Sequence, residues 1–146
     1  MKKIEIDTFL KFRFLSNPHF SPDGTKIAFT VSVPDRETNG YLSDLYLYDL
    51  GKKTVSRVTC AGDAKIWSWT AENTLIFTAA RTAALKKEKE NGTSFLYEIS
   101  PSGGEAQCIT SIPATVTGIR LLPNGRYLLT IRHDNYRDTR KKSYEV

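Results

Sequence analysis

A fifteen-residue segment of the chain occurs twice. The first copy, LYLYDLGKKTVSRVT, runs from Leu45 to Thr59, and the second, LYEISPSGGEAQCIT, runs from Leu96 to Thr110. Both copies begin with Leu-Tyr, place a glycine turn in the middle and end with an aliphatic residue followed by threonine. A repeat with a period of about fifty residues and several short strands is typical of β-propellers, in which each unit is one blade.

A hairpin pattern recurs between these segments. FSPDGTKIAFT, from Phe20, aligns with WTAENTLIFTA, from Trp69, after one deletion, and with LLPNGRYLLTI, from Leu121. Each copy has a bulky apolar residue, a polar turn and an alternating apolar run. Asp-Gly and Asn-Gly between such runs predict tight type I′ hairpins, because both central residues of that turn need positive φ. The predicted turn pairs are Asp23-Gly24, Glu72-Asn73 and Asn124-Gly125.

The two repeated halves together predict an all-β fold. We expect a partial β-propeller of about two and a half four-stranded antiparallel blades, preceded by a short N-terminal arm or helix. The expected divisions are an N-terminal arm at 1–15, a first blade at 16–59, a second blade at 60–114 and the first, truncated part of a third blade at 115–146.

Two segments do not follow the repeat. Residues 81–93 are expected to form a helix-like surface insertion in the second blade, because Thr82 can cap a helix and Gly92 can end it. The N-terminal stretch IDTFLKFRFL has Asp7 as a possible N-cap, but its apolar residues are too dense for one helical face. A short helix and an extended arm across the first blade both remain open there.

The number of blades is too small for a closed ring. A propeller needs about four to eight blades, and an incomplete arc leaves strand edges that can pair with other chains. We therefore expect either that the chain is a fragment of a longer protein or that it closes by self-association through its open blade edges. The fragment is the favoured interpretation.

Charge and hydropathy restrict the partners. The net charge is +5, but the basic residues are scattered among acids, apart from a basic tail that contains Arg137, Arg140, Lys141 and Lys142. We interpret this tail as solvated surface and expect no nucleic-acid partner. No apolar run is long enough to span a bilayer, and the first residues lack the apolar core of a signal peptide, so we expect a cytoplasmic protein without membrane contact.

The metal-ligating residue types are few and far apart. The cysteines, Cys60 and Cys108, lack metal-ligand spacing, and the histidines, His19 and His133, are distant in the sequence. We therefore expect no metal or other cofactor. The two thiols are expected to be free and buried or half-buried, as in a reducing compartment.

Several stretches resemble one enzyme family. NPHFSPDGTKIAFTVS, SDLYLYDL, SRVT and YEISPSGGEAQCIT resemble the start of the prolyl oligopeptidase family of serine peptidases, in particular its acylaminoacyl-peptidase and dipeptidyl-aminopeptidase-like branch. The Ser-Pro-Asp-Gly repeat also occurs in periplasmic propellers of the Tol translocation system, but the expected lack of a signal sequence argues against that relative. The resemblance implies an N-terminal propeller that caps a C-terminal α/β-hydrolase domain with a Ser-Asp-His triad and admits only short peptides.

The catalytic residues of that family have no matching positions here. The nearest approach to the Gly-x-Ser-x-Gly elbow is Gly92-Thr93-Ser94-Phe95-Leu96, which fails at its fifth position and precedes a predicted strand instead of a helix. His133 and Asp134 are adjacent, so on a strand they would point to opposite faces. We therefore predict no catalytic, cofactor-binding or metal residues.

The predicted function is that of a non-catalytic propeller fragment of a serine peptidase, which gates the access of short peptides to a hydrolase domain absent from this chain. The expected partners are that domain and the peptide substrates. The alternative is a self-assembling, protein-binding propeller-like scaffold with no enzymatic role. Further repeats and a serine elbow after Val146 would decide for the peptidase.

Three side chains are candidate binding residues. His19 lies at the end of a first strand, which lines the channel of a propeller, although a histidine bonded to neighbouring backbone is the default interpretation. Trp67 and Trp69 share one face of a strand, where they form either a substrate-binding pair or, as we favour, packing between blades. The long loops in VPDRETNGYLS and ARTAALKKEKENGT are expected to share one rim and to make recognition contacts there.

Overall fold

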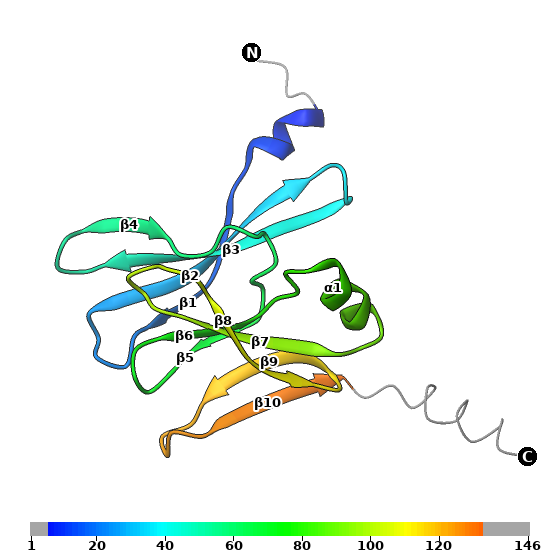
Figure 1. Cartoon of the computed structure of the whole chain (residues 1–146). Helices are drawn as coiled ribbons and strands as arrows, with labels where there is room; N and C mark the ends of the chain where they lie inside the picture. The colour runs from blue at the N-terminus through cyan, green and yellow to red at the C-terminus, as the bar shows by residue number, and fades with distance from the viewer. Residues whose placement is uncertain (1–5, 133–146) are drawn as a thin grey trace, which may run out of the picture.

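The structure is a computed structural model that describes residues 6–132 (Figure 1). The sequence-based expectations for His133, Asp134 and the basic tail lie outside these residues.

Three antiparallel sheets follow one another along the chain. The first has the order β1-β2-β3-β4 and the second β5-β6-β7-β8, while β9 pairs with β10. The strands of the first sheet are β1 (Phe14–Phe20), β2 (Lys26–Asp35), β3 (Gly40–Asp49) and β4 (Thr54–Arg57). Those of the others are β5 (Trp67–Trp69), β6 (Leu75–Thr78), β7 (Ser94–Ile99), β8 (Gln107–Ile112), β9 (Thr115–Leu121) and β10 (Tyr127–Arg132). The predicted fold class, an all-β partial propeller, is confirmed.

The hydrophobic core lies between the two four-stranded sheets. Alternate residues of β2 and β3 face the second sheet, as expected for strands with one buried face. The buried cluster comprises Ala28, Leu45, Leu47, Ala64, Trp67, Trp69, Leu75, Phe77, Ala79, Phe95, Tyr97, Ile99 and Ala106. Phe77 and Leu45 have no exposed surface. Burying a side chain of this size contributes about 1.5–3 kcal/mol, so this interface holds the two sheets together.

The hairpin turns differ from the predicted type I′ geometry. Only one residue of each predicted pair has positive φ, namely Gly24 at 70°, Asn73 at 61° and Gly125 at 75°. The backbone N–H of each donates to the carbonyl three residues earlier, with distances of 2.8, 3.2 and 3.0 Å. This is a type I turn closed by a left-handed residue. The type I′ prediction is wrong, because Pro22 and Pro123 are preset for the second position of a type I turn.

The first of the two expected long loops is mostly strand. Pairing of β2 with β3 continues to Asp35 opposite Gly40, so only residues 36–39 form the turn. Val33 lies opposite Leu42 and Pro34 opposite Tyr41, and these apolar pairs extend the hairpin beyond the sheet. The expectation of a long loop in VPDRETNGYLS is therefore wrong.

The second loop contains helix α1 (Ala83–Glu90). The Oγ1 atom of Thr82 accepts a 3.2 Å hydrogen bond from the backbone N–H of Leu85, which caps the helix at its start. No residue of α1 is fully buried, so the helix lies on the surface. In Figure 1, α1 and the β2–β3 hairpin lie on one side of the molecule, and the turns β1–β2, β5–β6 and β9–β10 lie on the opposite side.

The N-terminal arm is a short 3-10 helix, η1 (Ile6–Lys11), followed directly by β1. Asp7 lies inside this helix and not before it, and its carboxylate pairs with Arg36 of the β2–β3 turn at 3.1 Å. The ring of Phe9 lies 5.7 Å from that of Phe14 and 6.4 Å from that of Tyr41. The arm is thus attached to the tip of the β2–β3 hairpin.

The two cysteines differ from expectation in one respect. Cys60 and Cys108 are free but exposed, whereas the sequence predicted buried or half-buried thiols. Cys108 lies on β8, the outer strand of its sheet, of which nearly every residue is exposed. Cys60 lies in the connection after β4, outside the core.

Candidate functional site

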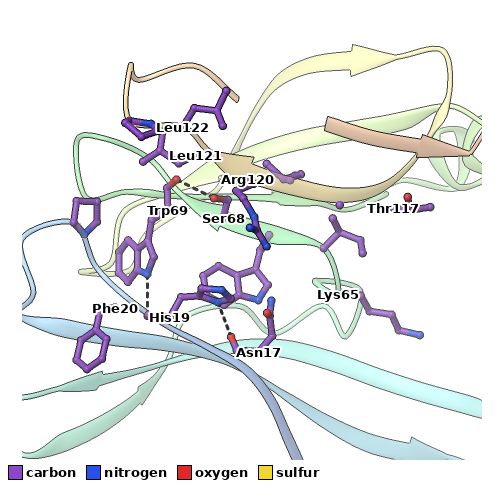
Figure 2. Close-up of a pocket in the computed structure, with 16 residues that line it drawn as sticks. Asn17, His19, Phe20, Lys65, Ser68, Trp69, Thr117, Arg120, Leu121 and Leu122 are labelled. Atoms are coloured by element: carbon purple, nitrogen blue, oxygen red, sulfur yellow. Dashed lines mark hydrogen bonds between the residues drawn. The ribbon is translucent and has the colours of Figure 1, made fainter. Parts of the chain in front are cut away.

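The first strands of the three sheets enclose a groove of about 760 Å³ (Figure 2). Residues from β1, β5 and β9 and from the turns that follow β1 and β9 line this groove, which we call the central groove. Its lining comprises Asn17, His19, Phe20, Pro22, residues 65–69 and residues 117–123. This is where the sequence predicted the channel-lining strands, and it is the candidate site.

The tryptophan pair forms one wall of the central groove and is itself fixed by the first sheet. Both indoles are only 4% exposed. The Nε1 atom of Trp67 donates to Oγ1 of Thr30 at 2.9 Å, and Nε1 of Trp69 donates to the carbonyl of His19 at 3.1 Å. The structure therefore places both rings in the packing between the first two sheets, the interpretation favoured from the sequence.

His19 lies at the end of β1, exposed, with its ring edge-on to that of Trp67 at a centroid distance of 5.6 Å. Its Nδ1 atom lies 3.2 Å from the carbonyl oxygen of Asn17. Because a carbonyl only accepts hydrogen bonds, Nδ1 carries the hydrogen in this contact, and Nε2 is left for another partner. The ring is thus bonded to neighbouring backbone and still lines the groove.

Asn17 is a groove residue that sequence reasoning missed. It has φ of 56°, and the β1–β2 register shifts between Ser16 and His19. The dipeptide Asn17-Pro18 carries the signal, because asparagine tolerates left-handed backbone and proline cannot donate to a ladder. The irregularity brings the Asn17 carbonyl to His19.

Arg120, on β9, was also missed, and it gives the central groove much of its charge. Figure 2 shows its side chain directed into the space between β9 and β1. Lys65 and His19 are the other basic side chains of the lining, and the lining includes no aspartate or glutamate. The sequence signal that could have identified Arg120 is its position on the first strand of a blade, because first strands face the central axis of a propeller.

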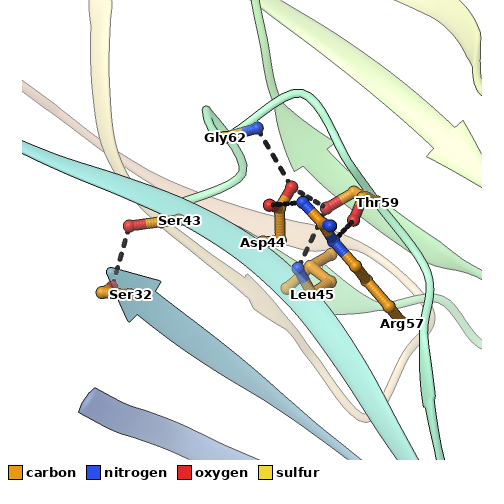
Figure 3. Close-up of polar contacts among 7 residues, drawn as sticks. All are labelled: Ser32, Ser43, Asp44, Leu45, Arg57, Thr59 and Gly62. Carbon is orange, nitrogen blue, oxygen red and sulfur yellow. Dashed lines mark hydrogen bonds and ion pairs between the residues drawn. The ribbon is translucent and has the colours of Figure 1, made fainter. Parts of the chain in front are cut away.

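A second polar cluster, shown in Figure 3, lies at the connection between the first two sheets. The carboxylate of Asp44, 9% exposed, accepts from Nη2 of Arg57 at 2.6 Å, from Oγ1 of Thr59 at 2.9 Å and from the backbone N–H of Gly62 at 3.0 Å. The hydrogen bond from Arg57 to Asp44 raises the pKa of the guanidinium. Because both oxygens of this carboxylate are bonded to β4 or to the connection that follows it, the cluster is structural.

Ser94, the serine of the segment that comes nearest to a Gly-x-Ser-x-Gly elbow, also has a structural role. Ser94 is the first residue of β7, is 8% exposed, and its Oγ accepts a 2.9 Å hydrogen bond from the backbone N–H of Val116. It thus joins the second sheet to β9. A small cavity of about 200 Å³ beside it is lined by Asp63, whose Oδ2 accepts from the N–H of Ala80 at 2.8 Å and whose buried Oδ1 has no partner.

Residues 6–132 hold no cluster of metal ligands and no membrane-spanning helix. No three His, Cys, Asp or Glu side chains in this part of the chain gather closely enough to hold a metal ion. None of its helices has the length and apolar character required to cross a membrane.

Sheets of consecutive strands whose first strands share one groove define the class of the protein, a β-propeller. The chain is 29% identical over 133 residues to the uncharacterized peptidase YuxL of Bacillus subtilis strain 168, a match that covers 88% of this chain and 19% of that protein. No protein-family profile matches the chain.

Solved peptidase structures have the same fold. An acylaminoacyl peptidase in complex with Z-Gly-Gly-Phe-chloromethyl ketone aligns with a TM-score of 0.64 at 17% identity, over 89% of this chain and 20% of that one. The acylaminoacyl peptidase of Pyrococcus horikoshii aligns equally well, with the same coverage. The propeller domain of the trilobed protease of Pyrococcus furiosus, described as having an open velcro topology, aligns with a TM-score of 0.59 at 15% identity, over 83% of this chain and 34% of that one.

These matches confirm the resemblance found in the sequence: the chain has the fold of the propeller region of a prolyl oligopeptidase family peptidase. The chain spans about a fifth of the length of the curated relative and of the acylaminoacyl peptidases.

Proposed function

We propose that this chain is part of a non-catalytic propeller that limits the access of substrates to the α/β-hydrolase domain of a serine peptidase acting on short peptides. The observation that carries the proposal is the match to a curated peptidase over 88% of the chain. The hydrolase domain of the same protein and its peptide substrates are the proposed partners.

The geometry of the central groove supports an access role. The groove follows the first strands of the sheets and is walled by indoles that are fixed between two sheets, so its width is set by rigid elements. An extended peptide is narrower than a folded domain, so a rigid channel of this kind discriminates by size. Among the described residues, the serine and histidine considered as candidates, Ser94 and His19, are bonded to backbone groups and not to each other.

Within the family we favour the acylaminoacyl-peptidase and dipeptidyl-aminopeptidase-like branch, and we propose a cytoplasmic location. Support for the branch comes from the sequence stretches that resemble it and from the fold shared with the acylaminoacyl peptidases. Support for the compartment comes from Cys60 and Cys108, because exposed free thiols persist in a reducing environment.

The test narrows the groove in the full-length protein. Thr117 is exposed on β9 and lines the groove, so Thr117→Trp adds bulk there without disturbing the core. We expect the variant to lose kcat/KM for a pentapeptide several-fold and to keep it for a small ester. Thr54→Trp is the matched control, because Thr54 is exposed on β4 and does not line the groove. Equal peptide turnover in both variants would contradict the proposal.

A second candidate function, the self-assembling scaffold, is favoured by one observation. The second sheet covers one face of the first sheet, and the other face is partly exposed. On the other face Leu15 is 67% and Val55 60% exposed. Large exposed apolar groups on one face of a sheet are suited to contact with another blade or another copy.

A further inference from the structure

We propose that the central groove binds carboxylate groups of peptides, through Arg120 together with His19 and Lys65, and that peptides with an acidic side chain or a free C-terminal carboxylate are the preferred ligands. This inference rests on the proposed function, because it names the substrate class that the groove admits.

The Arg120 side chain is exposed and, within residues 6–132, has no protein partner that would compete with a ligand. Its backbone pairs with Leu128 of β10, but among the described residues its guanidinium has no hydrogen-bond or ion-pair partner, although it lines the groove. Arg57 is engaged with Asp44 at 2.6 Å and Arg81 with the ring of Tyr97 at 5.1 Å from its centroid. Arg126, outside the lining, is like Arg120 without a side-chain partner in this part of the chain. A guanidinium offers five donors in a planar fork that matches a carboxylate, so a free one directed into a groove is suited to that group.

The lining of the central groove carries charge of one sign. It contains Arg120, Lys65 and His19 but no aspartate or glutamate, although the chain as a whole has 16 acidic residues against 21 lysines and arginines. Figure 2 shows Lys65 at the margin and Arg120 in the interior of the site. A cleft with one sign of charge and apolar walls concentrates ligands of the opposite sign.

His19 is held in place at the edge of the groove. Its ring is fixed by the Asn17 carbonyl at Nδ1, and its backbone carbonyl is fixed by Trp69 at 3.1 Å. The remaining nitrogen, Nε2, accepts a peptide N–H when the ring is neutral and donates to a carboxylate when it is protonated. The groove thus offers a cation for the carboxylate and a positioned ring for the adjoining backbone.

Binding in the central groove can be measured by tryptophan fluorescence. Its two tryptophans, Trp67 and Trp69, both line the groove, so intrinsic fluorescence measures binding there. We would titrate the chain with acetyl-Gly-Glu-Gly-amide, acetyl-Gly-Gly-Gly with a free carboxylate, and the neutral acetyl-Gly-Gln-Gly-amide. We expect the Glu peptide to bind about ten-fold more tightly than the Gln peptide, as one charge-assisted contact provides. The peptide with a free carboxylate shows whether a C-terminal carboxylate binds as tightly as the carboxylate of a side chain.

Variants at Arg120 test whether this residue causes the preference for the Glu peptide. Arg120→Gln should abolish the preference for the Glu peptide, while Arg120→Lys should keep part of it. Arg126→Gln, in the exposed β9–β10 turn and outside the lining, is the control that should bind like the wild type. An unfolding curve for each variant shows that it is folded.

The proposal is overturned if the Gln and Glu peptides bind equally, if no peptide binds, or if Arg120→Gln leaves the preference unchanged. Its failure is distinct from failure of the access role. If the Glu peptide is preferred but Thr117→Trp does not change peptide turnover, the carboxylate site is supported and the access role is contradicted. The converse result would leave an access role without charge selection.

Discussion

Trp67 and Thr30 join the first two sheets by a hydrogen bond between side chains. The indole Nε1 of Trp67 on β5 donates to Oγ1 of Thr30 on β2 at 2.9 Å, and both residues are 4% exposed. Trp69, two positions along β5, makes the equivalent contact with the backbone of His19. The two indoles therefore fix the position of β5 against the first sheet, and with it one wall of the central groove.

Removing the acceptor should destabilise this junction. Thr30→Val keeps the volume and the β-branch but leaves the buried indole N–H without a partner, so we expect a loss of about 1–3 kcal/mol. The midpoint of urea denaturation measures it. Thr54→Val, at an exposed position of β4, should change the free energy of unfolding by less than about 0.5 kcal/mol. Equal effects of the two substitutions would show that the indole bond contributes nothing specific.

The ion pair at Asp44 should matter more than the other ion pair described. Asp44→Ala removes the acceptor for Arg57, Thr59 and Gly62, and we expect a loss of about 2 kcal/mol, since the Asp44 side chain is 9% but the Arg57 side chain 49% exposed.

The control for this prediction is Asp7→Ala, which breaks the pair of Asp7 with Arg36. The two side chains of that pair are 56% and 75% exposed, so the expected loss is about 0–1 kcal/mol. Chemical denaturation of both variants gives the comparison. A larger loss for Asp7→Ala than for Asp44→Ala would contradict the structural role of the Asp44 cluster.

The first hairpin turn should make stability dependent on acid pH. Hydrogen bonds from Ser21 and from the backbone and side chain of Thr25 lower the pKa of Asp23 from 3.8 to about 2. A carboxyl with a depressed folded-state pKa stabilises the fold above its unfolded pKa, and the contribution is lost as the pH falls towards 2.

Asp23→Asn keeps an acceptor oxygen but loses the charge. The wild type should therefore be more stable than the variant at pH 6, and the difference should shrink between pH 4 and pH 2. Denaturation midpoints of both proteins across this range measure it. A difference that stays constant with pH would contradict the assignment to the Asp23 carboxylate.

The exposed face of the first sheet should drive association of the isolated chain. We expect concentration-dependent oligomers by light scattering, because Leu15 and Val55 present exposed apolar surface to solvent. Leu15→Lys should shift the chain towards monomer, whereas Lys52→Glu in the β3–β4 turn should not. A monomer that persists at every concentration in the wild type would contradict this expectation.

Most of the fold could be predicted from the repeat. Leu-Tyr segments and apolar runs recur because each blade buries the same positions, so the strands could be predicted from one sequence. Turn type could not, because the hairpin signal at Asp23-Gly24 competes with Pro22, which selects a type I turn. The length of the β2–β3 hairpin was missed because polar residues at its tip resemble a loop, although Val33 and Leu42 pair across it.

The candidate site was less accessible to sequence reasoning. His19, Trp67 and Trp69 were identifiable as residue types of interest on first strands. Arg120 was not, because a single arginine on a strand is ordinary in sequence, and only the convergence of β1, β5 and β9 brings it to the groove. Asn17 depends on a local break in pairing that the alternating pattern does not predict.

The central claim is that the chemistry lies outside this chain, in a hydrolase domain of the same protein. Labelling the full-length protein with a fluorophosphonate that reacts with activated serines, followed by peptide mapping, tests it directly. The account predicts one labelled serine, in a Gly-x-Ser-x-Gly sequence beyond residue 146, and no label at Ser94. Label at Ser94, or no labelled serine in the protein, would contradict it.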